Sequence, residues 1–206
     1  MLKRARIAVL VSGGGTNLQA LIDAAGRGEI PHGEIVLVVS NRRDAYAVER
    51  ARNAGIEARV VSRADYADAH GQEEALISVL DNHDIDIIVL AGFLMILSRE
   101  FTSRYEGRII NIHPSLIPAF CGQGMYGLKV HEAVLAAGVK VTGATVHFVN
   151  EIPDGGKIIA QKAVEVREGD TPEMLQRRVM EEAEWVLLPQ AVEDVAQRYC
   201  KGRDWK

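Results

Sequence analysis

The sequence predicts a single α/β domain built on one doubly wound, mostly parallel sheet. Short, continuous apolar runs alternate with stretches of helical periodicity, and a glycine-rich loop joins the first run to the first helix. The chain has 206 residues, of which 48% are hydrophobic, so it suits one domain with a sizeable core. We expect this domain to span residues 1–200 and residues 201–206 to form a tail.

The charge and cysteine content argue against several classes of protein. The net charge is -4 with no Lys/Arg-rich run, so we expect no nucleic-acid partner. No apolar run approaches the ~20 residues of a membrane span, and residues 7–11 are too short for a signal-peptide core. Cys121 and Cys200 have no Cys or His at metal-ligand spacing. We therefore expect a cytoplasmic protein with no membrane partner and no metal.

The first strand, residues 6–11, leads into the loop Ser12-Gly13-Gly14-Gly15-Thr16-Asn17, after which helical spacing begins. Glycines let the backbone approach an anion, and the N–H groups at a helix start can receive a phosphate. The loop is neither a Walker A loop nor G-x-G-x-x-G. It favours a monophosphate, although a purely structural glycine turn is the alternative.

NAD is disfavoured by the tip of the second strand, residues 34–39. A dinucleotide fold for NAD usually carries an acid near that tip to hold the ribose. The first acid here, Asp44, is instead predicted to be the N-cap of a helix over residues 44–54.

Strands over residues 57–61 and 86–91 and helices over residues 73–82 and 98–104 continue the alternation. Residues 92–97 form an apolar loop at the carboxyl edge of the sheet. Such a loop can line a pocket for a flat organic ligand, and plain packing under a helix is the alternative.

The next strand, residues 108–112, carries two polar side chains where ligands bind in open α/β sheets. Asn111 and His113 are two residues apart, so their side chains leave the strand on the same face. Pro114 lacks an N–H and ends the strand. The alternative is an Asn that satisfies a turn beside a surface His.

The remaining residues predict a long irregular loop (116–127), a helix (128–137) and an antiparallel strand pair (141–149 and 157–166). Thr145 and His147 share one face of the first of these strands, and Asp154 lies in the turn. Thr171 and Pro172 begin a long final helix that reaches about residue 197 and can break at Pro189.

Asn111, His113 and an acid such as Asp154 suit acyl transfer to an amine without a covalent intermediate. Attack on an acyl carbon makes an oxyanion, to which an amide and a protonated imidazole can donate hydrogen bonds. A carboxylate favours the protonated imidazole and can help to move the proton of the attacking amine. A zinc site from His113, His131 and His147 is the weaker hypothesis, because no short ligand spacing supports it.

The sequence resembles the phosphoribosylglycinamide formyltransferases, which are folate-dependent glycinamide ribonucleotide transformylases. The resemblance spans nearly the whole chain, and its matching stretches are Ser12-Gly13-Gly14-Gly15-Thr16-Asn17-Leu18-Gln19, Val89-Leu90-Ala91-Gly92-Phe93, Asn111-Ile112-His113-Pro114-Ser115-Leu116, Gly143-Ala144-Thr145-Val146-His147-Phe148-Val149 and Asp154-Gly155-Gly156. It implies a Rossmann-like formyltransferase fold. It also implies formyl transfer from the co-substrate 10-formyltetrahydrofolate to the amine of glycinamide ribonucleotide, in de novo purine synthesis.

The resemblance also implies a role for each part of the chain. Residues 1–105 would be the ribonucleotide-binding half and residues 106–200 the catalytic and folate-binding half. The residues implied are Asn111, His113 and Asp154 for catalysis, Thr145 and His147 in support of them, Gly15, Thr16, Asn17 and Glu184 for the ribonucleotide, and Leu94, Met95, Ile96, Leu97, Asn111, Glu151, Ile152, Pro153 and Asp154 for the folate. Glu184 is assigned by its distance from Pro189.

The sequence departs from many relatives at the folate side. Met95 and Ala69 stand where an Arg is common, and the loop after His113 is longer. These differences concern the folate tail and not the chemistry.

Three other functions remain as rivals. Methionyl-tRNA formyltransferase needs a further C-terminal domain, and formyltetrahydrofolate deformylase usually carries an extra N-terminal one. A non-catalytic nucleotide-binding module needs only the phosphate loop. We expect small-molecule partners and a monomer or a homodimer.

Overall fold

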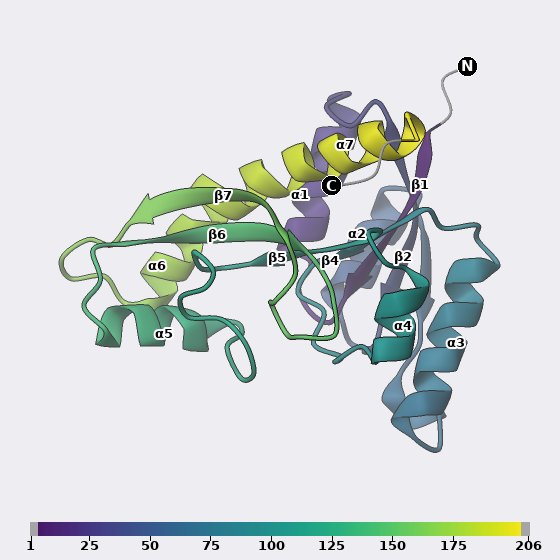
Figure 1. Ribbon diagram of the computed structural model, residues 1–206, viewed down its shortest axis with the longest axis horizontal. Helices are drawn as coiled ribbons and strands as arrows, with labels where there is room; N and C mark the ends of the chain where they lie inside the picture. The colour runs from purple at the N-terminus through teal and green to yellow at the C-terminus, as the bar shows by residue number, and fades with distance from the viewer. Residues whose placement is uncertain (1–3, 203–206) are drawn as a thin grey trace.

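The computed structural model describes residues 4–202, so residues 1–3 of the predicted domain and residues 203–206 of the predicted tail lie outside it. Within the described residues, one seven-stranded sheet has the order β3-β2-β1-β4-β5-β6-β7 (Figure 1). Its strands are β1 (Ala5–Val11), β2 (Gly33–Ser40), β3 (Glu57–Val60), β4 (Ile87–Leu90), β5 (Ile109–His113), β6 (Val141–Phe148) and β7 (Ile158–Glu165). β1 to β5 run parallel, whereas β6 is antiparallel to both β5 and β7. The predicted fold class is confirmed.

Helices cover both faces of the sheet. They are α1 (Thr16–Gly26), α2 (Tyr46–Asn53), α3 (Ala69–Asp81), α4 (Arg99–Arg104), α5 (Leu128–Ala136), α6 (Pro172–Val179) and α7 (Trp185–Cys200), with a 3-10 turn η1 (Arg63–Asp65) and a π-helical segment η2 (Met180–Glu184). Strand β1 shows why the apolar runs are continuous. Ile7 and Val9 pack into the cluster of α1, α2, α6 and α7, and Ala8 and Leu10 into that of α3 and α4.

Two predicted helix features are wrong. Asp44 is not an N-cap: α2 begins at Tyr46 after Ala45, and the Asp44 carboxylate instead pairs with Arg42 at 2.9 Å. Pro189 does not break the last helix, which departs from α geometry earlier, in η2. This wide turn ends just before Trp185. In a regular α-helix the Pro189 ring would clash with the Trp185 carbonyl four residues earlier, and the wide turn relieves this clash. Ser98 and Thr171 cap α4 and α6, since the hydroxyl of each accepts a backbone N–H three residues on.

Candidate active site

The change from parallel to antiparallel pairing aligns four polar side chains. Across β5 and β6, Asn111 lies opposite His147 and His113 lies opposite Thr145. Directly opposed residues project from the same face of a sheet, so all four gather on one surface. His113, Thr145 and His147 are buried. Such buried polar groups require hydrogen-bond partners.

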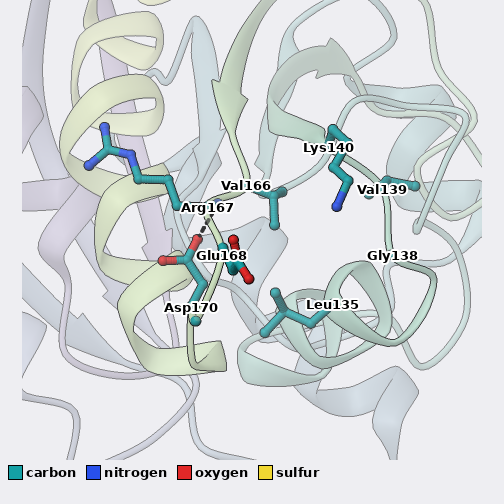
Figure 2. Close-up of a pocket in the computed structure, with 9 residues that line it drawn as sticks. Leu135, Gly138, Val139, Lys140, Val166, Arg167, Glu168 and Asp170 are labelled. Atoms are coloured by element: carbon teal, nitrogen blue, oxygen red, sulfur yellow. Dashed lines mark hydrogen bonds between the residues drawn. The ribbon is translucent and has the colours of Figure 1, made fainter.

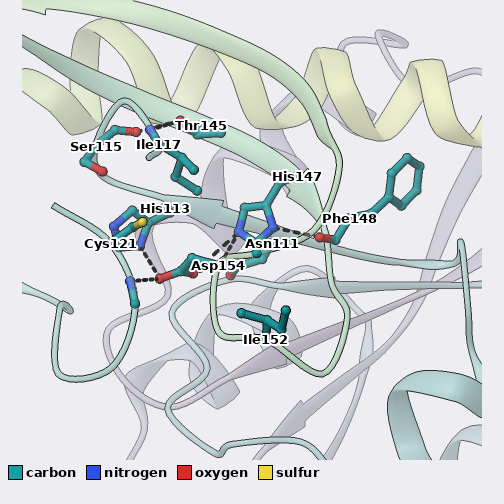
Figure 3. Close-up of polar contacts among 12 residues, drawn as sticks. Asn111, His113, Ser115, Ile117, Cys121, Thr145, His147, Phe148, Ile152 and Asp154 are labelled. Carbon is teal, nitrogen blue, oxygen red and sulfur yellow. Dashed lines mark hydrogen bonds and ion pairs between the residues drawn. The ribbon is translucent and has the colours of Figure 1, made fainter. Parts of the chain in front are cut away.

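Asp154 reaches this surface because the turn between β6 and β7 folds back over the sheet. The turn holds Asp154 at a positive φ of 55° and brings Gly156 so close to β6 that a Cβ there would lie 1.7 Å from the Phe148 carbonyl oxygen. The Asp154 carboxylate lies 3.5 Å from His113 Nδ1 and accepts from Asn111 Nδ2 at 3.4 Å (Figure 3). The structure therefore brings the three predicted catalytic residues together.

His147 fixes the amide of Asn111. Its Nδ1 lies 2.7 Å from the Phe148 carbonyl, which can only accept, so in the neutral ring Nε2 is the acceptor. That Nε2 lies 3.1 Å from Asn111 Nδ2 and 3.5 Å from Asp154 Oδ1. Both amide hydrogens of Asn111 thus have an acceptor, and the bond to Asp154 is the longer of the two.

The loop of residues 114–127 contributes to the site through its backbone. His113 Nε2 lies 2.9 Å from the Phe120 carbonyl oxygen, and the Gly122 N–H donates to Asp154 Oδ2 at 2.8 Å. Burial raises the pKa of Asp154, whereas the charge of His113 and the Gly122 N–H lower it, and the net pKa lies below the usual value. Asp154 is therefore ionised at neutral pH. Sequence reasoning missed Phe120 and Gly122, because backbone groups leave no signature in residue type.

His131, on α5, is fully buried, and neither of its ring nitrogens has a hydrogen-bond partner among the described residues. Burial lowers the pKa of His131 to about 4, and the charge of His113 acts in the same direction. Within residues 4–202, no three His, Cys, Asp or Glu side chains are grouped to hold a metal ion.

The glycine loop and the distant Glu184 meet at the start of α1. Gly15 precedes the helix with a φ of 71°, and a Cβ there would lie 2.6 Å from the Cβ of Ala47. Asn17 Nδ2 donates to Glu184 Oε2 at 2.6 Å, whereas the buried Asn17 Oδ1 has no donor within the described part of the chain. Burial raises the pKa of Glu184 to about 7, and the Asn17 bond partly offsets this. Thr16 contacts Met180 of η2.

The two predicted folate segments, residues 94–97 and 151–154, lie next to each other. An ion pair of 3.1 Å joins Arg99, just after the first segment, to Glu151 in the second. Ile96 is 75% exposed, Ile152 59% and Leu94 54%. Met95 and Leu97 are half-buried, and Pro153 is exposed. Exposed apolar side chains beside a polar cluster suit an organic ligand.

Two cavities lie outside the catalytic cluster. One of about 310 Å³ adjoins the glycine loop and is lined by Thr16, Gln19, Ala20, Asp23, Arg27, Arg50 and Trp185. Another, of about 480 Å³, lies between the loops that precede β6 and follow β7 (Figure 2). It is at the opposite end of β6 from His147. Its wall includes Asp170, which is held by Arg178 at 2.5 Å.

None of the helices in the described part of the chain combines the length and the apolar character that crossing a membrane requires.

Comparison with known proteins identifies the family to which the chain belongs. The sequence profile described as "Formyl transferase" matches residues 5–192. The chain is 40% identical over 203 residues to the chloroplastic phosphoribosylglycinamide formyltransferase of Arabidopsis thaliana, covering 98% of this chain and 69% of that protein. It is 41% identical over 184 residues to phosphoribosylglycinamide formyltransferase of Haemophilus influenzae, covering 89% and 84%.

Longer proteins and solved structures give the same result. The chain is 46% identical over 194 residues to the trifunctional purine biosynthetic protein adenosine-3 of Bos taurus, covering 94% of this chain but 18% of that protein. Glycinamide ribonucleotide transformylase 1 from Symbiobacterium toebii superposes with a TM-score of 0.87 at 42% identity, covering 97% of this chain and 89% of that one. The chain therefore belongs to the formyl transferase family.

Proposed function

We propose that this protein transfers the formyl group of 10-formyltetrahydrofolate to the amine of glycinamide ribonucleotide. The products are formylglycinamide ribonucleotide and tetrahydrofolate, in a step of purine nucleotide synthesis. The observation that carries the proposal is the convergence of Asn111, His113 and Asp154, from a strand and a distant turn, on one buried surface. The names of the relatives and solved structures described above support the same reaction.

The chemistry is direct attack of the amine on the formyl carbon. The new C–N bond forms as the carbonyl becomes an oxyanion, which Asn111 and protonated His113 stabilise by hydrogen bonds. The contact of 3.4 Å between Asn111 and Asp154 is the weaker amide bond, so it is the one that the oxyanion replaces. Collapse of the intermediate breaks the bond to N10 of the folate, which takes up a proton.

The Asp154 carboxylate, 3.5 Å from His113 Nδ1, places a negative charge beside the imidazolium that the proposal requires. It also receives the proton of the attacking amine, directly or through a water molecule. Its low pKa supports this assignment, because a general base must be ionised at working pH. Thr145 and His147 support the catalytic residues, Thr145 through the loop beside His113 and His147 through the Asn111 amide.

The substrates bind on either side of this cluster. In the proposal, residues 1–105 form the ribonucleotide-binding half, in which the backbone of Gly15 and Thr16 holds the phosphate. Asn17 and Glu184 bind the rest of the ribonucleotide, and the unpartnered Asn17 Oδ1 supports a ligand that brings a donor. Residues 106–200 form the catalytic half. The folate lies against the apolar side chains of residues 94–97 and 151–154.

The test is to incubate the protein with 10-formyltetrahydrofolate and glycinamide ribonucleotide while following folate absorbance. Formation of tetrahydrofolate that depends on the ribonucleotide supports the proposal. Folate deformylation that proceeds equally without the ribonucleotide contradicts it. The chain has two cysteines, too few for a disulfide framework, in keeping with the cytoplasmic location that we also propose. Size measurement in solution would decide between a monomer and a homodimer.

A further inference from the structure

We propose that Gln161, on strand β7, is a positioning residue for the catalytic site, acting through Thr145 and the loop of residues 114–127. The inference rests on the proposed function only for the roles of His113 and Asp154. Gln161 touches neither of these residues in the structure. Its effect passes through a set of hydrogen bonds among Ser115, Ile117, Thr145 and Gln161, which we call the Thr145 clasp.

The hydroxyl of Thr145 is the centre of the clasp and is fully buried. It donates to the Ser115 carbonyl at 2.7 Å and accepts the Ile117 N–H at 3.1 Å (Figure 3). It also accepts from Gln161 Nε2 at 3.0 Å. A hydroxyl offers one donor and two acceptor sites, so these three bonds use all of its capacity.

Gln161 closes the clasp from the edge of the sheet. Its Nε2 also donates to the Ile117 carbonyl at 3.0 Å, so both amide hydrogens are used. The N–H and the carbonyl of Ile117 are therefore both fixed, although this residue lies in an irregular loop. Gln161 and Ile117 are 44 residues apart in sequence, so the contact joins β7 to the loop directly.

The clasp lies immediately before the two loop groups that contact the catalytic pair. Three residues beyond Ile117, the Phe120 carbonyl lies 2.9 Å from His113 Nε2, and two residues further the Gly122 N–H donates to Asp154. A second bond, from Ser115 Oγ to the Ala119 carbonyl at 2.6 Å, holds the intervening turn. Holding the backbone of Ile117 in place therefore helps to position the Phe120 carbonyl and the Gly122 N–H against the site.

Gln161 is not needed for the core. Its side chain is exposed on an edge strand, and β7 pairs with β6 through backbone bonds that a side-chain change leaves in place. The residue can therefore be replaced without removing buried apolar surface. A loss of activity on replacing Gln161 can therefore be assigned to positioning of the loop and not to loss of core packing.

The test compares Gln161→Leu and Gln161→Glu with Lys162→Leu. Leu removes both donors at similar size, and Glu offers acceptors only. Lys162 is an exposed neighbour on the same strand whose side chain projects from the opposite face, so it is the matched control. Turnover, KM for each substrate and the pH dependence of kcat are measured, together with hydrogen exchange of peptides covering residues 116–124.

We expect both Gln161 variants to lower kcat roughly tenfold or more, since small misplacements of reacting groups are costly. KM for the ribonucleotide should stay within about twofold, because the glycine loop does not contact the clasp. The acid limb of kcat should move to higher pH as Asp154 loses the Gly122 N–H, and residues 116–124 should exchange faster. Lys162→Leu should match the wild type in every measurement.

The inference would be overturned if both Gln161 variants had the same kcat, pH profile and hydrogen exchange as the wild type. It would also be overturned if kcat fell while the pH profile and the hydrogen exchange stayed unchanged. Should Gln161→Leu fail to fold, the more polar Gln161→Glu on this exposed strand carries the test. A wild-type protein that transfers no formyl group contradicts the proposed function. An active wild type with unaffected Gln161 variants contradicts only this inference.

Discussion

Asn111 Nδ2 lies 3.1 Å from His147 Nε2 across the antiparallel pair of β5 and β6. An amide group is nearly symmetric in shape, so its orientation depends on its neighbours. The acceptor nitrogen of His147 turns the NH₂ group of Asn111 toward Asp154. The donor that the proposed mechanism requires is therefore set by a residue that need not touch substrate.

Replacing His147 tests this orientation. His147→Phe keeps an aromatic ring but removes the acceptor, so we expect kcat to fall by about tenfold to a hundredfold, as for the loss of a buried hydrogen bond. His147→Gln retains an acceptor oxygen and should lose less. Steady-state rates with 10-formyltetrahydrofolate and glycinamide ribonucleotide provide the measurement. Equal losses in the two variants would contradict the role of His147 as the acceptor that orients Asn111.

Asp154→Asn removes the charge of the carboxylate while keeping its shape. Asn cannot balance the charge of His113 or take up the proton of the amine, so we expect kcat to fall by roughly a hundredfold or more. The fold should remain intact, because the side chain lies in a turn and not in the core. The measurement is kcat with a parallel circular dichroism spectrum. Glu168→Gln, an exposed acid at the far end of the sheet, is the control, and a near-normal rate for Asp154→Asn would exclude the assigned role.

Gly15→Ala tests the packing of the glycine loop. The residue has a φ of 71°, and the new methyl group would lie 2.6 Å from the Ala47 Cβ on α2. We expect the free energy of unfolding to fall by about 2 kcal/mol or more. Gly13→Ala, with open space around its Cβ position and no such φ, should change it by less than about 0.5 kcal/mol. Denaturant titration measures both, and similar values for the two would refute the close approach.

Glu184→Gln tests the buried acid beside the glycine loop. Its pKa of about 7 lies above the ordinary 4.5, so the folded state holds a proton that the unfolded state releases. Stability is therefore lost as pH rises from about 4.5 to 7, by up to roughly 3 kcal/mol. Gln cannot ionise and should remove this loss. The free energy of unfolding is measured at pH 5, 6, 7 and 8, and that of Glu184→Gln should increasingly exceed that of the wild type as the pH rises. A constant difference between the two proteins would count against a buried acid that holds a proton.

Much of the fold could be predicted because its signals are local. The apolar run of residues 6–11 is buried on alternate faces by two helix layers, as a strand in a parallel sheet must be. Ser98 and Thr171 cap helices through bonds that span three residues. Asp44 is not the cap because α2 begins two residues later, at Tyr46, and the Asp44 carboxylate pairs with Arg42.

The site could be predicted in its side chains but not in its backbone. The shared face of Asn111 and His113 follows from strand alternation, whereas the choice of Asp154 as their acid comes from the family resemblance. The Phe120 carbonyl and the Gly122 N–H could not be predicted, because any residue supplies these groups and only the path of the loop brings them to His113 and Asp154. The meeting of Asn17 with Glu184 also depends on tertiary packing, since 167 residues separate them.

The polar groups around Asp154 are already hydrogen-bonded to one another, and this limits how much they can add to the binding free energy of a substrate. Asn111, His113 and the Gly122 N–H already have acceptors before any ligand arrives. When a formyl group binds, these donors exchange an acceptor within the protein for one on the ligand. The new hydrogen bonds therefore add little to the binding free energy. The proposed folate site therefore predicts that binding is driven by covering the exposed side chains of Leu94, Ile96 and Ile152, and calorimetry should register this as a negative change in heat capacity.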